Sequence, residues 1–89
     1  MSFKFEIFLS NKSKKFYESL SQSDKSRIKE KLLLLAQDPF PFGYKKLKGR
    51  ENLFRIRVGG YRILYTVDIQ KKTILIFRIG RRESVYQAL

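Results

Sequence analysis

The sequence contains no cysteine and no histidine, and these absences exclude several kinds of active site. Without cysteine there is neither a disulfide bond nor a thiolate nucleophile. Without histidine, a Ser-His-Asp or Cys-His arrangement and a paired-histidine nuclease site cannot form, and structural zinc sites lose their usual ligands. Any enzymatic chemistry must therefore rely on other side chains.

Acidic residues are scarce, with eight against twenty lysines and arginines. They are dispersed and show no Asp-x-Asp spacing, which disfavours a two-metal nuclease, so we expect neither a metal nor a cofactor. The sequence also lacks a Gly-x-x-x-x-Gly-Lys loop and a dinucleotide fingerprint. Its longest apolar run, residues 32–36, is far too short to span a bilayer, and the N-terminus has no continuous signal-peptide core. We therefore predict a soluble protein.

Positive charge is what the chain has in excess. Its 89 residues carry a formal net charge of +12, which implies a polyanionic partner: nucleic acid, an acidic protein or an anionic membrane surface. Seven of the eight arginines lie in the second half of the chain. The hydrophobic fraction of 43% is typical of a folded protein, and the length suits one domain over residues 1–89.

Hydrophobic periodicity predicts an α+β fold with helices covering one face of a small sheet. Period-two spacing predicts an N-terminal strand with one buried face, carried by Phe3, Phe5, Ile7 and Leu9. Two helices are expected next, one capped at Ser10-Asn11 over residues 12–21 and one from Ser23 or Asp24 to about residue 37. The second helix should bury one stripe, formed by Ile28, Leu32, Leu35 and Ala36.

Three further strands, at residues 53–58, 61–67 and 73–79, predict an antiparallel meander followed by a short tail from residue 80. Between the helices and the meander, residues 38–43 should form an irregular connection and residues 45–49 a solvated loop. The turn at residues 69–72 has no glycine, so the sequence leaves the register of the last strand pair open.

The Gly59-Gly60 pair predicts a tight hairpin, since glycine supplies the positive φ angles that such a turn requires. In that hairpin Arg57 faces Arg62, and Arg55 lies on the same face. Like charges directly opposite each other are destabilising, so this face needs an anionic partner, with phosphate as the leading candidate.

These arginines belong to a larger cationic and aromatic set. It comprises Lys45, Lys46, Lys48, Arg50, Arg55, Arg57, Arg62, Arg78, Arg81, Arg82, Tyr61, Tyr65 and Tyr86. Guanidinium groups match phosphate oxygens, and tyrosines can stack on unpaired bases. A metal-free RNase could activate a ribose 2′-hydroxyl and stabilise the phosphorane with arginines. Composition alone does not separate such an enzyme from a passive binder, and core packing is the favoured role of Tyr61 and Tyr65.

Three segments, residues 46–49, 54–65 and 79–86, resemble the RelE/ParE toxin superfamily. The resemblance extends over essentially the whole chain and implies the RelE-like, microbial-ribonuclease-like fold. RelE proteins cut messenger RNA in the ribosomal A site, whereas ParE proteins inhibit DNA gyrase. The tail, with glycine, a basic residue and arginine followed by Val85-Tyr86, is more similar to the RelE branch.

The resemblance also implies residue roles. Arg62 would stabilise the scissile phosphate, Arg82 would assist the leaving group, and Tyr86 would stack on or activate the nucleotide. Arg55 and Arg57 occupy positions where the best-known RelE proteins carry lysines, and arginine cannot lose its proton as lysine can. We therefore assign Arg55 and Arg57, like Arg62, to stabilising the transition state. The general base would be Tyr86 or Lys48, or the activity would be slow. The remaining basic positions would contact RNA or the ribosome, namely Lys45, Lys46, Lys48, Arg50, Arg78 and Arg81.

The partners that the resemblance implies are messenger RNA, the ribosome and an acidic, partly disordered RelB-like antitoxin that folds on binding. It implies a cytoplasmic location, no membrane partner, and a toxin–antitoxin heterotetramer as one assembly. Two alternatives stay open on the same scaffold. One is a ParE-like gyrase inhibitor, and the other is a non-catalytic RNA-binding module.

Overall fold

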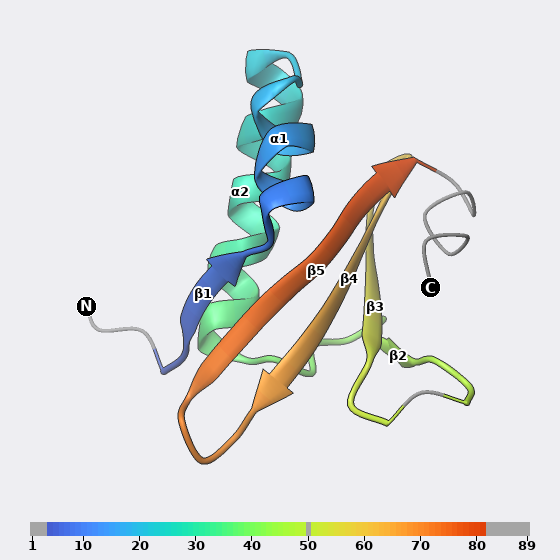
Figure 1. Cartoon of the computed structure of the whole chain (residues 1–89). Coiled ribbons are helices and arrows are strands. Elements are labelled where there is room, and N and C mark those ends of the chain that lie inside the picture. Colours follow the sequence, from blue (N-terminus) through green and yellow to red (C-terminus); the bar gives the residue numbers. More distant parts are fainter. Residues whose placement is uncertain (1–3, 50, 82–89) are drawn as a thin grey trace.

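The computed structural model describes residues 4–49 and 51–81, and it confirms the α+β class (Figure 1). The elements follow in the order β1 (Glu6–Leu9), α1 (Asn11–Glu18), α2 (Gln22–Gln37), β2 (Lys45–Lys46), β3 (Phe54–Val58), β4 (Tyr61–Asp68) and β5 (Thr73–Arg81). The predictions for Phe3, Arg50, Arg82, Tyr86 and the rest of the tail beyond Arg81 lie outside the described residues.

The strands form one sheet in the order β1-β5-β4-β3-β2. The predicted meander of β3, β4 and β5 is confirmed as its antiparallel centre, and β1 joins β5 in parallel. Our prediction of a loop at residues 45–49 is wrong at its start, because Lys45 and Lys46 pair with β3. Both lysines are exposed, so this edge strand is held by backbone pairing and leaves no hydrophobic pattern in the sequence.

Two helix boundaries differ from the prediction. The Ser10 hydroxyl accepts a hydrogen bond from the Ser13 backbone at 3.1 Å, which confirms the first cap, but α1 ends at Glu18 instead of residue 21. The second cap is Ser21, whose hydroxyl accepts from the Asp24 backbone at 3.2 Å. Ser23 and Asp24 were therefore the wrong caps, since Ser21 already has the extended backbone that a cap residue needs.

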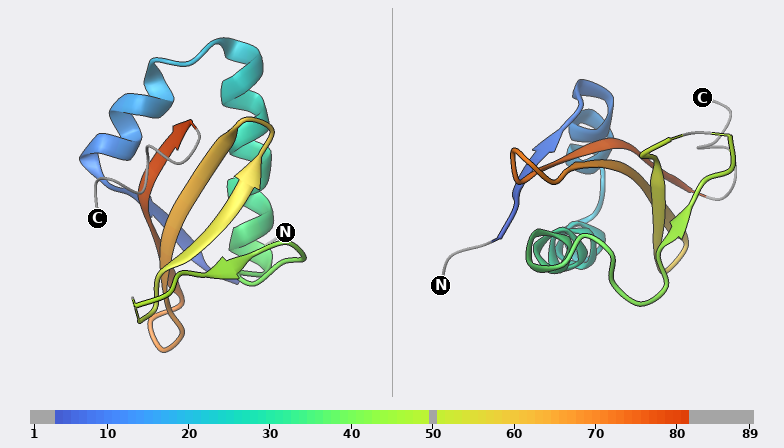
Figure 2. Two further views of the ribbon diagram at one scale, coloured as in Figure 1. Left: turned by 90° about the vertical axis from the view of Figure 1, so that its right-hand side faces the viewer. Right: turned by 90° about the horizontal axis from the view of Figure 1, so that it is seen from below.

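The helices bury one face of the sheet, which we call the core face. The predicted stripe of α2 is confirmed, because Ile28, Leu32, Leu35 and Ala36 are all buried. In the left view of Figure 2 the strands β3 and β4 lie in front of α2, and α1 lies beside β5. Among the described residues, no helix is long and apolar enough to cross a membrane.

A β-bulge between β4 and β5 decides which side chains of β5 face the core. Tyr65 pairs with Ile76 and Leu64 with Arg78, so Phe77 is an extra residue in β5. Strict alternation from Ile76 would have placed Arg78 in the core. The bulge instead returns Ile79 to the core face and places Arg78 on the opposite face. The strand also continues through Arg81, which we had assigned to the tail.

The buried Tyr65 hydroxyl makes the stability of the fold depend on pH in the alkaline range. Its side chain is fully buried, and its hydroxyl donates a hydrogen bond to the Pro39 carbonyl at 2.6 Å. Burial raises the pKa of the Tyr65 hydroxyl above its ordinary value of 10, and Tyr44 and Asp38 add to that rise.

Because the folded state favours the protonated form, the stability that Tyr65 contributes is complete below about pH 10 and is lost as the pH rises further. We expect Tyr65→Phe to lose less unfolding free energy between pH 9 and about pH 12 than the wild type does. Urea denaturation at a series of pH values measures this difference. Parallel pH profiles for the two proteins would contradict it.

Candidate functional site

The face of the sheet opposite the helices, which we call the open face, carries two rows of residues that run across the strands. The turn-end row is Arg57, Arg62 and Gly80, next to the Gly59-Gly60 turn. The middle row is Lys45, Arg55, Leu64 and Arg78. Both predicted pairings of the hairpin, Val58 with Tyr61 and Arg57 with Arg62, are confirmed. Four arginines from three strands therefore share one face.

The four arginines differ in how far they are buried. Arg57 is exposed, whereas Arg55, Arg62 and Arg78 are half-buried. The Nε atoms of Arg62 and Arg78 are buried and have no hydrogen-bond partner within residues 4–49 and 51–81. A buried donor without an acceptor is unfavourable by about 1–3 kcal/mol, and more when it is charged. The two residues as a whole are only half-buried, so it is their terminal guanidinium nitrogens that can donate to an incoming anion.

A small apolar cluster forms the floor of the open face. Leu64 is fully buried and Leu53 nearly so, and the partly buried Leu47 and Phe77 pack against them. The segment between β2 and β3 supplies two of these side chains and lies over this part of the sheet. The arginines thus stand next to an apolar surface, where electrostatic interactions are stronger than in bulk water.

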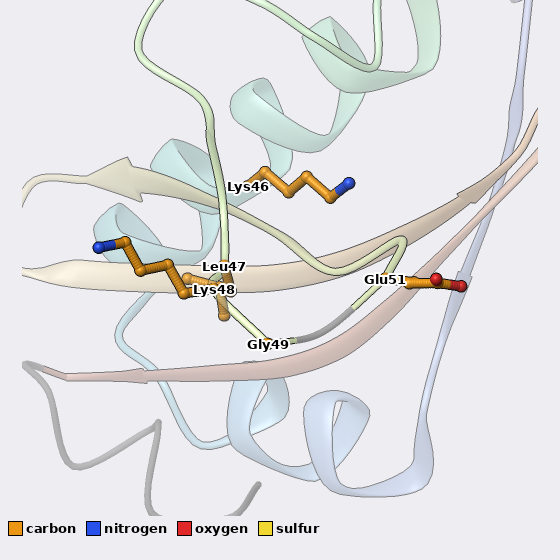
Figure 3. Close-up of a pocket in the computed structure, with 5 residues that line it drawn as sticks. All are labelled: Lys46, Leu47, Lys48, Gly49 and Glu51. Atoms are coloured by element: carbon orange, nitrogen blue, oxygen red, sulfur yellow. The ribbon is translucent and has the colours of Figure 1, made fainter.

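The lysines of residues 45–48 are not gathered at one place. Lys45 shares the face of Arg55, but Lys46 pairs with Phe54 and lies on the core side. Lys46 and Lys48 line a shallow hollow of about 450 Å³, and Figure 3 shows them pointing to opposite sides of the segment. Of the three predicted lysines, register therefore places Lys45 alone in the arginine rows.

Arg81 lies on the core face, away from the two rows. It pairs with Tyr61, donates a hydrogen bond to the Tyr61 hydroxyl at 3.0 Å, and lies over the Tyr61 ring at 5.2 Å. That hydroxyl donates in turn to Asp24 at 2.6 Å, and Asp24 pairs with Arg27 at 3.8 Å. The predicted core positions of Tyr61 and Tyr65 are confirmed, since both are buried.

Sequence reasoning missed Asp24 and Arg27 as part of this arrangement. With Gly60, Tyr61 and Arg81 they line a second hollow, of about 500 Å³. Asp24 and Tyr61 are 37 positions apart, and no local pattern links them. Gly59 has a φ of +55°, a conformation that favours glycine, and a side chain there would displace the flexible Arg27 guanidinium.

No group of three carboxylates capable of holding a metal ion occurs in the described part of the chain. The chemistry that these residues offer is cationic: fixed guanidinium donors on an apolar floor.

Comparison with known proteins identifies the family. The family model of the ParE toxin of type II toxin–antitoxin systems, parDE, matches residues 8–86. The chain belongs to the RelE/ParE toxin family. The Methanocaldococcus jannaschii protein called RelE1 is 32% identical over 87 residues, covering 94% of this chain and 97% of the relative.

Solved structures of RelE proteins share the fold. The RelE of the archaeal RelE–RelB complex from Pyrococcus horikoshii OT3 superposes with a TM-score of 0.79 at 28% identity, over 90% of this chain and 97% of the other. In the RelB–RelE antitoxin–toxin complex from Methanococcus jannaschii the TM-score is 0.71 at 27% identity, over 92% and 98%. The predicted RelE-like fold is confirmed.

Proposed function

We propose that this RelE-family toxin is a metal-independent endoribonuclease that cleaves messenger RNA in the ribosomal A site. The observation that carries the proposal is the pair of arginine rows on the open face, in which Arg57 faces Arg62 and the Arg62 Nε has no acceptor among residues 4–49 and 51–81. A phosphate on this face would accept hydrogen bonds from the terminal guanidinium nitrogens and would relieve the repulsion between Arg57 and Arg62.

The proposed reaction is an internal transfer within the RNA strand. The ribose 2′-oxygen attacks the adjacent phosphorus while a base takes its proton, and the bond from phosphorus to the 5′-oxygen then breaks. Arg62 and Arg57 stabilise the negative charge that builds up on the phosphorane oxygens. By family resemblance, Arg82 assists the departing 5′-oxygen, and the base is Tyr86 or Lys48.

The same proposal includes two macromolecular partners besides the messenger. The ribosome presents an RNA surface to which a chain of net charge +12 is attracted. An acidic RelB-like antitoxin would neutralise the toxin, as RelE is found bound to RelB in the Pyrococcus horikoshii complex. Cytoplasmic action and a toxin–antitoxin heterotetramer belong to this proposal.

Cleavage mapping on a translated messenger tests the proposal directly. We expect primer extension to show new 5′ ends within codons at the A site when ribosomes are translating. The matching upstream fragments should end in 2′,3′-cyclic phosphates. The same messenger without ribosomes should stay intact. Equal cutting of free RNA would contradict ribosome dependence, and no cutting in either sample would contradict the enzyme.

A gyrase inhibitor is the second candidate, because the matching family model is that of the ParE toxin. A DNA supercoiling assay with purified gyrase separates the two candidates. Loss of supercoiling together with an intact translated messenger would favour the inhibitor. Tight, salt-sensitive RNA binding without growth arrest would instead identify a non-catalytic binding module.

A further inference from the structure

The β-bulge places Arg78 on the open face, and no step of the proposed reaction uses this residue. Without the extra residue Phe77, Arg78 would follow Ile74 and Ile76 into the core. Bulges next to active sites commonly redirect a side chain in this way. The bulge therefore does two things at once: it keeps a charge out of the core and adds that charge to the face where Arg62 lies.

The Arg78 side chain is held in place, but its Nε has no acceptor within residues 4–49 and 51–81. It is half-buried, and its guanidinium lies 5.6 Å from the centre of the Phe77 ring. Its Nε atom is buried without a hydrogen-bond partner in the described part of the chain. Nor does any carboxylate there pair with Arg78, whereas Asp24 pairs with Arg27 on the other side of the sheet. Among the described residues, the Arg78 guanidinium therefore has an aromatic contact but no anionic partner.

The spacing of the two rows suits a polyanion that runs along the strands. Arg55 and Arg57 are two residues apart on β3, and Arg78 and Gly80 are two apart on β5. Two residues of antiparallel strand span about 7 Å. Successive phosphates of an extended single strand are similarly spaced, so a phosphate at the turn-end row would bring its neighbour to the middle row.

We propose that Arg78, with Arg55 and Lys45, forms a second phosphate subsite in the middle row, which binds the phosphate next to the scissile one. This inference rests on the proposed function, because Arg62 defines the scissile position. The apolar floor at Leu64 lies between Arg55 and Arg78 in the row and strengthens their attraction for the anion. The subsite holds the messenger in register while the neighbouring row stabilises the transition state.

Salt-dependent binding to the free protein tests the subsite without requiring catalysis. The probe is a fluorescent oligouridylate of about 12 nucleotides, which is long enough to cover both rows. Arg78→Gln should lower the affinity at least about tenfold at low salt and make the slope of log K against log [salt] shallower by about 0.7, the value for one phosphate of a single strand. The matched control is Lys29→Gln, which removes one charge from an exposed position on α2.

The control should bind the oligouridylate with the affinity of the wild type, and thermal melting should show that both variants fold. Equal affinities and slopes for Arg78→Gln and Lys29→Gln would overturn the subsite. The subsite would also be overturned if Arg78→Gln bound RNA as the wild type does but bound an acidic antitoxin peptide more weakly. The middle row would then bind the protein partner.

A double-mutant cycle, which combines a modified messenger with Arg78→Gln, shows on which side of the scissile phosphate the subsite lies. The messenger carries one uncharged methylphosphonate at the linkage next to the scissile phosphate, on either its 5′ or its 3′ side. At one of these two positions, the neutral linkage and Arg78→Gln should each slow wild-type cleavage about tenfold, and together they should slow it no more than either alone.

If the effects of the neutral linkage and of Arg78→Gln on the cleavage rate multiply at both positions, the assignment of Arg78 to a neighbouring phosphate is overturned. If the wild type leaves every messenger intact, the proposed reaction fails, and the oligouridylate measurement still decides whether Arg78 binds phosphate. The two failures are therefore distinguishable.

Discussion

Arg62→Gln is expected to slow messenger cleavage by about 10²–10³-fold, the usual loss when one well-aimed donor to a developing oxyanion is removed. Arg62 lies at the centre of the turn-end row, between Arg57 and Gly80, and its buried Nε has no acceptor in the described structure. The measurement is the rate of A-site cleavage with saturating programmed ribosomes, together with growth arrest on induction in cells.

Lys29→Gln is the control for this variant, because it removes the same charge from the outer surface of α2. It should cleave at the wild-type rate, and Arg62→Gln should keep the wild-type melting temperature or exceed it, since one of two opposed arginines is gone. Full toxicity of a folded Arg62→Gln protein would refute the enzymatic proposal. The same loss is expected for Arg82→Ala, on the basis of family resemblance.

Leu35→Ala is expected to lower the free energy of unfolding by about 2–5 kcal/mol. Leu35 is fully buried in the core cluster between α2 and the sheet. Its truncation leaves a cavity that the β-strands cannot close, because they are fixed by their hydrogen bonds. The total stability of a domain of this size is only about 5–10 kcal/mol, so the variant should melt well over 10 °C lower.

Leu34→Ala provides a control with the same chemistry on the same helix, one position away. Its side chain is 55% exposed, so the change should stay within about 0.5 kcal/mol. Urea denaturation of both variants measures the contrast. Equal losses for Leu34→Ala and Leu35→Ala would mean that the face of α2 that packs on the sheet has been misassigned.

Much of this architecture could be predicted because it depends on local patterns. The α2 stripe recurs at helical spacing, and Gly59-Gly60 permits the turn that sets Arg57 opposite Arg62. The order of strand, two helices and meander could also be predicted, as could the family. The cap of α2 was misassigned because Ser21 and Ser23 are chemically equivalent as caps, and only the backbone conformation distinguishes them.

The candidate site was predicted only in part. Alternation along β3 and β4 was enough to place Arg55, Arg57 and Arg62 on one face. Arg81 could not be placed in the same way, since its partner Tyr61 and the further partner Asp24 come from different elements. Edge strand β2, which separates Lys45 from Lys46, is too short and too polar to leave a pattern.

The sequence by itself determined the class of fold, the excess of positive charge and the three arginines of the hairpin, because periodicity and turn chemistry act between near neighbours. Only the tertiary structure decided that Arg78 joins them and that Arg81 does not. That choice depends on the one-residue bulge at Phe77, which forms where β4 and β5 pair, and on the Tyr61 hydroxyl, which is shared with a helix. Both are contacts between distant segments, and no local pattern records them.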